Sequence, residues 1–461
     1  MPFTYHPPTR QACDVCQKRN GNLKPIVDTH RGKASSADNF PIHNWYNFVL
    51  GYSPEFPDYV LQRENVSSQH FVVDPFLGSG TTMVCCKAKG IPSAGVEAND
   101  FFEFAAKVKL DWDLDPEILR KYQKKILGNI EKEFSHYSWP VATTQAQLPL
   151  VSTGNLNPIE YAQKNRPKLL LEKYVSDSPF TKLILVRNEL ERIKWPTKEM
   201  RDFFYLAYSG SILPASNVRY GPGFGVIKAK IDIDVLGIFT KRLERMISDI
   251  ESISDKKSIK TKAKVYLGDA RQLTKYLKNG SVDFMITSPP YPGDHEYTKH
   301  SKLELMFNGF AHSLDTFREI KQRMLRGSTT NIYKNDNEGE VVKDIKSISK
   351  IVKEIDKRLK EDKATSGFEK LYTKLIWEYF GGMYNVFQET KKVLKPGGKF
   401  SLLVSDSHAF KMVHIETAEL LKDVAQKAGF ADCHIELWQY KNSTSHKFKL
   451  LENILTVTKS K

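Results

Sequence analysis

Two short segments of the sequence carry residues whose types and spacing suit chemistry. The first reads D-P-F-L-G-S-G-T-T over residues 74–82. Its glycines, Gly78 and Gly80, let the backbone approach a ligand closely, and the helix expected to follow offers unpaired N–H groups. Glu97 ends the next expected strand, where an acid can accept hydrogen bonds from ribose hydroxyls. This pattern predicts a nucleotide-like ligand. The alternative is that the glycines only allow the backbone to turn between strand and helix.

The kind of ligand is narrowed by what the glycine segment lacks. It has no lysine of the phosphate-binding P-loop type, and the third glycine of a dinucleotide fingerprint is absent. These departures favour a ligand without a pyrophosphate. A ligand carboxylate could instead meet the hydroxyls of Thr81 and Thr82.

The second segment, T-S-P-P-Y at residues 287–291, follows an apolar stretch directly. Two prolines stiffen the backbone and remove N–H donors, which leaves carbonyl oxygens free to accept. Ser288 adds an acceptor oxygen and Tyr291 an aromatic face. Together they could hold a planar exocyclic amine between the Ser288 oxygen and the Pro289 carbonyl, with a flipped base stacked on Tyr291. The alternative is a simple turn that ends a strand.

These segments require a sheet that places the ends of several strands together. Apolar runs predict strands at residues 71–74, 93–97, 265–267, 282–287, 399–404, 431–440 and 453–458. A helix is expected at residues 81–89, where Gly90 stops it. Seven strands, mostly parallel with helices between them and the last two antiparallel, predict a doubly wound α/β fold.

The combination of motifs resembles a known family. The segments D-P-F-L-G-S-G-T-T, V-E-A-N (96–99), G-D-A-R (268–271) and T-S-P-P-Y, in this order, resemble the amino-group DNA methyltransferases, and specifically S-P-P-Y modification methylases. That family uses S-adenosylmethionine to methylate cytosine N4 or adenine N6. The stretch from His43 to Phe56 is similar to the family segment that covers the methionine part of the cofactor. The resemblance implies the S-adenosylmethionine-dependent methyltransferase fold over roughly residues 41–112, 263–310 and 375–458.

The resemblance also implies roles for individual residues. The cofactor would be bound by Asp74, Pro75, Phe76, Gly78, Gly80, Thr81 and Thr82. Glu97 would bind its ribose and Asp269 its adenine amine. The catalytic pocket for the flipped base would consist of Ser288, Pro289, Pro290 and Tyr291. No metal is expected, because the amine attacks an already activated methyl group.

Several alternatives remain for the function. Ser288 favours cytosine N4, because the adenine N6 members of the family tend to have Asp or Asn there; adenine N6 is the main alternative. An RNA guanine-N2 methyltransferase also combines a D-P-F-x-G-S-G loop with a later P-P-Y motif, usually as N-P-P-Y or D-P-P-Y. A non-catalytic nucleic-acid-binding module with the same fold is a further possibility. Loss of catalysis would be expected to change at least one motif residue, however, and every motif residue is present.

The chain divides into a core with insertions. We expect an N-terminal extension (1–40), a methyltransferase core (41–112 and 263–458), a helical insertion (113–262) and a second insertion (311–370). Apolar spacing predicts helices at 116–134, 232–253 and 343–363, and small polar residues predict a loop at 209–225. The helical insertion is the expected target-recognition region. Its candidates for DNA contact are Asn217, Arg219, Tyr220 and the lysines of residues 256–264. The second insertion offers further candidates in Arg323, Arg326, Thr329, Thr330 and Asn331.

The overall charge favours a polyanionic partner. Lys and Arg number 69 against 54 Asp and Glu, a net charge of +15, although an ordinary basic soluble protein has the same balance. Double-stranded DNA is the polyanionic partner that the resemblance implies. No apolar run suggests a membrane span or a signal peptide, so we expect a cytoplasmic protein without a membrane partner. A cognate restriction endonuclease is the functional partner that the resemblance suggests. The oligomeric state stays open.

Cysteines do not indicate a disulfide framework. Five cysteines occur in 461 residues, and Cys13 and Cys16 form a lone C-x-x-C. A zinc site would need two further ligands. Reduced thiols are the expectation.

Overall fold

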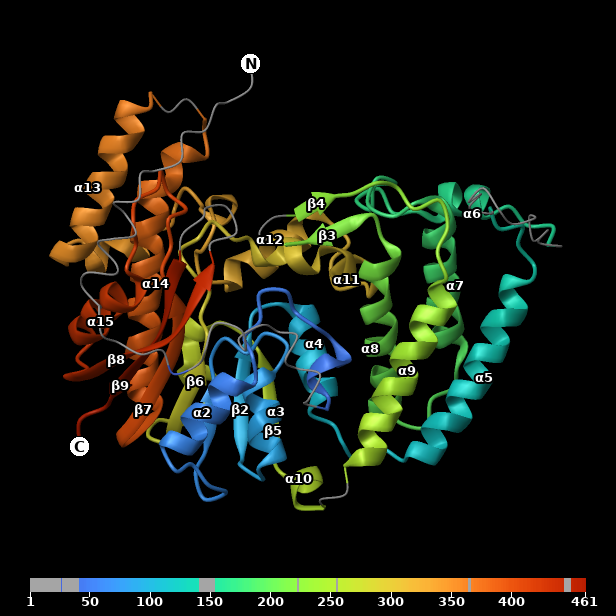
Figure 1. The fold of residues 1–461 in the computed structure, drawn as a ribbon, viewed down its shortest axis with the longest axis horizontal. Helices are drawn as coiled ribbons and strands as arrows, with labels where there is room; N and C mark the ends of the chain where they lie inside the picture. The colour runs from blue at the N-terminus through green and yellow to red at the C-terminus, as the bar shows by residue number, and fades with distance from the viewer. Residues whose placement is uncertain are drawn as a thin grey trace.

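The protein has a sheet half and a helical half, which lie side by side in the computed structural model (Figure 1). The structure describes residue 26 and residues 41–140, 154–221, 224–253, 256–363, 366–442 and 449–461. The sheet half contains the glycine segment and the T-S-P-P-Y segment. The helical half is formed by the insertion between them.

Seven strands form the main sheet in the order β5-β2-β1-β6-β7-β9-β8. Their bounds are β1 Val72–Asp74, β2 Ser93–Glu97, β5 Ala263–Leu267, β6 Val282–Thr287, β7 Leu394–Ser405, β8 Asp432–Asn442 and β9 Lys449–Thr458. The pairs from β5 to β7 are parallel, and β9 is antiparallel to both β7 and β8. Seven strands, mostly parallel, are therefore confirmed; the doubly wound arrangement stays a prediction.

The centre of this sheet determines where a ligand can bind. All three residues of β1 are buried, as expected for a parallel strand covered on both faces. The strand order runs from β1 through β2 to β5 on one side and through β6 to β7 on the other. At such a reversal, the carboxyl ends of two neighbouring strands leave a crevice for ligands. The two motifs follow β1 and β6, the strands that flank this crevice.

Helices accompany the strands and form the second insertion. They are α2 Glu55–Arg63, α3 Thr81–Ala88, α4 Asp100–Lys109, α11 Lys302–Phe307, α12 Leu314–Arg323, α13 Lys346–Glu361, α14 Tyr372–Val393 and α15 Thr417–Lys427. The predicted amphipathic helix is confirmed as α13, which buries Ile348, Val352 and Ile355. Among the described residues, no helix is long and apolar enough to cross a membrane.

The helical half is a bundle with a small hairpin at one end. Its elements are α5 Pro116–Phe134, α6 Pro158–Asn165, α7 Asp177–Arg192, α8 Lys198–Ala215, α9 Val235–Ser252, β3 Val218–Tyr220 and β4 Phe224–Val226. The short helix α10 Lys256–Lys260, which follows α9, contacts α3 of the sheet half. Helix α5 has the predicted bounds because Asp115 caps it and Pro116 occupies its first turn.

The predicted loop at residues 209–225 is wrong. Helix α8 continues to Ala215, and the antiparallel hairpin β3–β4 follows. The hydroxyls of Ser209 and Ser211 donate to backbone carbonyls one turn earlier, at 2.7 and 3.0 Å, so these polar residues are satisfied inside the helix. Gly210 packs closely against the Arg242 side chain of α9. Tertiary packing thus overrides the loop-like composition.

A buried carboxyl joins the two halves. Glu304 of α11 accepts hydrogen bonds from the hydroxyls of Tyr46 and Tyr220, at 3.0 and 2.9 Å. Tyr46 precedes the glycine segment, and Tyr220 belongs to the hairpin of the insertion. Burial raises the pKa of Glu304 to about 7, although the nearby Arg242 opposes that rise.

The raised pKa of Glu304 predicts a pH-dependent stability. The carboxyl favours folding most when protonated, so its contribution is complete below its unfolded pKa and is lost as the pH rises through about 7. Glu304→Gln keeps the shape without the charge. Its stability relative to the wild type should therefore rise by roughly 1–3 kcal/mol between about pH 5 and about pH 8, measured by urea unfolding.

The exposed ion pair of Glu354 with Arg358 provides the control. Glu354→Gln should show no comparable trend over this range. A difference between Glu304→Gln and the wild type that does not change with pH would contradict the role of burial.

Candidate active site

One cavity of about 840 Å³ brings the two motifs together at the carboxyl ends of the central strands. Among the predicted residues, it is lined by Pro75, Phe76, Gly78, Thr81, Glu97, Asp269, Ser288, Pro289, Pro290 and Tyr291. Asp74, Gly80 and Thr82 do not line it. Residues 48–53 also border the cavity, as the resemblance of the upstream segment implies.

The two glycines of the loop have different surroundings. Gly78 lines the cavity with φ +53°, and a Cβ there would lie 3.8 Å from Phe48. Gly80 has φ +92° and directly precedes α3, but a Cβ there would meet Ala106 of α4 at 3.3 Å. Gly78 therefore opens the cavity, whereas Gly80 allows a close approach between two helices.

Asp74 lies behind the cavity wall and connects its parts. Its fully buried carboxylate accepts from the Thr287 hydroxyl at 2.5 Å, the Tyr52 hydroxyl at 2.8 Å and the Phe76 amide at 3.0 Å. Burial raises the pKa of Asp74, and these hydrogen bonds oppose the rise. Thr82 takes part in the same network through Tyr52, at 2.5 Å. Asp74 and Thr82 therefore belong to a buried hydrogen-bond network that connects the glycine segment with the T-S-P-P-Y segment.

Glu97 presents a buried carboxylate to the cavity from the end of β2. Its oxygens accept from the amides of Gly78 and Asn99, at 2.7 and 2.8 Å. Burial raises the pKa of Glu97 to about 7. Each carboxylate oxygen has a further lone pair, so hydroxyl donors of a ligand can still be accepted.

Asp269 follows β5 and is held by an ion pair. The guanidinium of Arg271 donates to both Asp269 oxygens at 2.7–3.1 Å, and it also contacts Glu338 of the second insertion at 2.8 Å. The position of Asp269 at the cavity is thus set by Arg271. Sequence reasoning did not assign this partner, although G-D-A-R contains it.

The second insertion adds a wall that the motifs did not predict. Arg323, the last residue of α12, donates to the Ala98 carbonyl at 3.1 Å and forms an ion pair with Asp100. Arg323 and the adjacent Met324 and Leu325 line the cavity beside the predicted cofactor residues. No spacing in the sequence connects positions this far apart.

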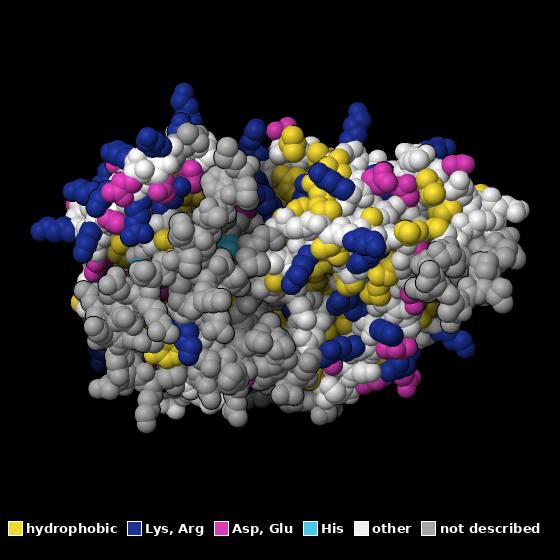
Figure 2. Space-filling view, turned by 45° about the horizontal axis from the view of Figure 1, so that its top comes forward, with side chains coloured by type: hydrophobic (Ala, Val, Ile, Leu, Met, Phe, Trp, Pro, Cys, Tyr) yellow, Lys and Arg dark blue, Asp and Glu magenta, His cyan; other side chains and the backbone are white. Residues whose placement is uncertain are grey.

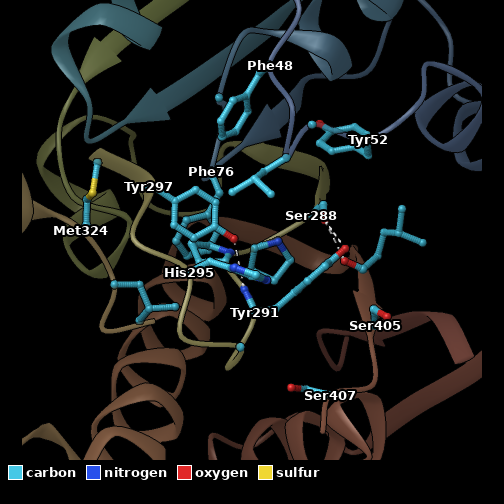
Figure 3. A pocket seen from close by; sticks show the side chains of 18 of the residues that line it. Phe48, Tyr52, Phe76, Ser288, Tyr291, His295, Tyr297, Met324, Ser405 and Ser407 are labelled. Atoms are coloured by element: carbon cyan, nitrogen blue, oxygen red, sulfur yellow. Dashed lines mark hydrogen bonds between the residues drawn. The ribbon is translucent and has the colours of Figure 1, made fainter. Parts of the chain in front are cut away.

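The T-S-P-P-Y segment forms the other end of the cavity (Figure 3). The Ser288 hydroxyl lies 3.0 Å from the Leu403 carbonyl, to which it donates, and 3.0 Å from the Tyr291 hydroxyl. The Tyr291 amide donates to the Tyr297 hydroxyl at 3.3 Å. Burial, and then the nearby Glu452 carboxylate, raise the pKa of Tyr291. The aromatic and polar groups of the motif are therefore adjacent, as a base-binding pocket requires.

The predicted DNA contacts receive a mixed result. Asn217 is 1% exposed and bonds Ser176, and Tyr220 is buried on Glu304, so the prediction is wrong for these two. Arg219 is exposed on the same hairpin. The side chains of Lys256 and Lys257, like Cys13 and Cys16, lie outside the described residues. Within the described part of the chain, no cluster of His, Cys, Asp or Glu side chains is suited to a metal ion.

Comparison with known proteins places this geometry in context. The chain is 23% identical over 439 residues to the Type II methyltransferase M.BsoBI of Geobacillus stearothermophilus, covering 89% of this chain and 82% of that protein. M.AvaI of Nostoc sp. is 21% identical over 405 residues, covering 85% and 79%. M.MjaII of Methanocaldococcus jannaschii is 32% identical over 171 residues, covering 36% and 27%. No family model matches the chain. The relatives support the resemblance to methyltransferases.

Proposed function

We propose that the protein is a site-specific DNA methyltransferase that transfers a methyl group from S-adenosylmethionine to the exocyclic amine of a flipped base, namely cytosine N4. The observation that carries the proposal is the convergence of the glycine segment and the T-S-P-P-Y segment at one cavity, with Asp74 and Thr287 bonded directly at 2.5 Å. Relatives named Type II methyltransferases match over most of the chain, which supports the same class of reaction.

The residues around the cavity fit the proposed cofactor. The absence of a side chain at Gly78 leaves room in the cavity wall, and Glu97 offers buried oxygens to ribose hydroxyls. Asp269 presents an acceptor suited to an adenine amine. When bound, the cofactor supplies an electrophilic methyl group on a sulfonium sulfur. We infer that residues 48–53 help to cover its methionine part.

The chain itself holds and orients the amine. The Ser288 oxygen and the Pro289 carbonyl would accept its two hydrogens, which favours a pyramidal nitrogen with a directed lone pair. The amine would take the place of the Tyr291 hydroxyl beside Ser288. The Tyr291 ring would then be available for stacking with the base. Once methylated, the nitrogen would lose one of its two protons to water, and S-adenosylhomocysteine would be the leaving group. Position rather than acid–base chemistry supplies most of the rate in this scheme.

Methylation of a ring carbon is disfavoured by the residues at the cavity. That reaction needs a cysteine nucleophile, and no cysteine lines the described cavity. The nearby Cys85 is buried, and burial raises its pKa to about 12. Such a thiol is a poor source of thiolate.

The electrostatics of the chain support binding to double-stranded DNA. Where the face turned forward in Figure 2 shows described residues, lysine and arginine side chains lie among hydrophobic side chains and some acidic ones. The β3–β4 hairpin exposes Arg219 and is followed by the exposed Lys228, while Gly221 lines the cavity. We infer that the insertion contacts DNA next to the pocket, and that a restriction endonuclease shares its recognition site.

Product analysis tests the proposed function directly. The gene would be expressed in a host without other DNA methylation, and its modified bases would be sequenced. N4-methylcytosine at one recurring sequence is the expected result. N6-methyladenine would correct the base but keep the enzyme class, whereas 5-methylcytosine alone, or no modification, would contradict the proposal.

Ser288→Ala tests the role of the hydroxyl. Loss of one positioned acceptor should lower the methylation rate by about 10² to 10³, by analogy with a deleted oxyanion-hole donor. Cofactor and DNA affinity should persist, since the hydroxyl acts on the amine. Ser281→Ala, at the opposite end of β6 and hydrogen-bonded to the Lys278 carbonyl, is the matched control. Full activity in Ser288→Ala would refute the assignment.

Gly78→Leu tests the proposed cofactor site. A side chain there enters the cavity, so calorimetry should show a loss of S-adenosylmethionine affinity of about 100-fold or more. Gly280→Leu carries the same backbone strain, at φ +60°, but meets nothing within 4 Å, and it should bind normally. Equal affinities in the two folded variants would place the cofactor elsewhere. A side chain at Gly80 would test helix packing instead.

A further inference from the structure

The antiparallel edge of the sheet contributes a polar cluster to the cavity. Gln439 on β8 pairs directly with Glu452 on β9, after a register shift between Leu437 and Gln439. Gln439, Lys441 and Glu452 all line the cavity at its T-S-P-P-Y end. No motif of the sequence includes these residues.

Glu452 is the fixed centre of this cluster. It is 1% exposed, and its carboxylate accepts from the Gln439 amide at 2.5 Å and forms an ion pair with Lys441. A buried carboxylate is costly unless it is paired, so these donors explain how Glu452 is tolerated. They also fix where the Lys441 ammonium lies.

Lys441 has donors beyond those that Glu452 requires. An ammonium has three N–H groups and no acceptor. The Lys441 nitrogen lies 5.9 Å from the centroid of the Tyr291 ring, and its side chain is 42% exposed. The Tyr291 hydroxyl is in turn 3.0 Å from Ser288. The amine acceptor, the aromatic ring and the cationic donor therefore border the same space.

We propose that Lys441, held in place by Glu452, forms a subsite for the O2–N3 edge of the target cytosine. This inference rests on the proposed function. With the amine at Ser288, cytosine presents two acceptors, N3 and O2, along the remaining edge of its ring. Adenine presents N1 and a C–H group there. A group that only donates hydrogen bonds therefore favours cytosine, which gives a physical reason for the choice of base.

The test compares two duplexes that differ only at the target base. The recognition sequence comes from the product analysis, and the target position carries either cytosine or an abasic site. Lys441→Met keeps most of the apolar stem but removes the charged donor. It should weaken binding to the cytosine duplex by about 10- to 100-fold, as expected for a lost hydrogen bond to a charged group, and leave the abasic duplex unchanged. Methylation kcat/KM on the cytosine duplex should fall by a similar factor.

Two further variants control for charge and folding. Lys449→Met removes an exposed lysine at the start of β9 that does not line the cavity, and it should bind both duplexes as the wild type does. Lys441→Met combined with Glu452→Gln avoids an unpaired buried carboxylate, and it should show the same selective loss. S-adenosylmethionine affinity in each variant reports whether the pocket is intact.

The outcomes separate this inference from the proposed function. Equal weakening on both duplexes would mean that Lys441 contacts phosphate, and unchanged cytosine binding would mean that it contacts nothing; either overturns the subsite. A wild-type protein that forms N6-methyladenine overturns the subsite but not the methyltransferase. A wild-type protein that methylates no DNA overturns the proposed function itself.

Discussion

The buried carboxylate of Asp74 is the interaction on which the site depends. It ends β1, and it accepts from Thr287 at the end of β6, from Tyr52 in the upstream segment and from the amide of Phe76 in its own loop. A buried carboxylate is expensive to leave unpaired, so all three contacts are strongly favoured together. The glycine segment therefore cannot shift relative to the T-S-P-P-Y segment without the loss of buried hydrogen bonds.

Much of the sheet half could be predicted from the sequence because its signals are local. Strands β2 and β6 have the predicted bounds, and β1 and α3 each differ from the prediction by one residue at one end. Short apolar runs stopped by Asp, Glu, Gly or Pro define these elements without reference to the rest of the chain. The motifs that they carry then meet at the cavity because neighbouring parallel strands end at the same edge.

The direction of individual side chains could not be predicted in the same way. Gly78 and Thr81 line the cavity, but their neighbours Gly80 and Thr82 do not. Gly80 faces Ala106 of α4, and the Thr82 hydroxyl bonds Tyr52 in the Asp74 network. Likewise, the sequence predicts Tyr220 as a DNA contact, but its buried hydroxyl donates a hydrogen bond to Glu304. Which side of a loop or hairpin faces the cavity depends on partners that are distant in the sequence, such as Tyr52 for Thr82, 30 residues away, and Glu304 for Tyr220, 84 residues away.

The antiparallel edge explains why the last part of the chain reaches the site at all. Because β9 runs opposite to β7, its first residues lie beside the last residues of β7, and Glu452 pairs with Ser405. Strand β8, antiparallel to β9, brings the end that carries Gln439 to the same edge. Ser288 carries no charge, and this edge adds the charged side chains of Lys441 and Glu452 to the same cavity. The sheet register, rather than the motif alone, thus determines the polarity of the pocket.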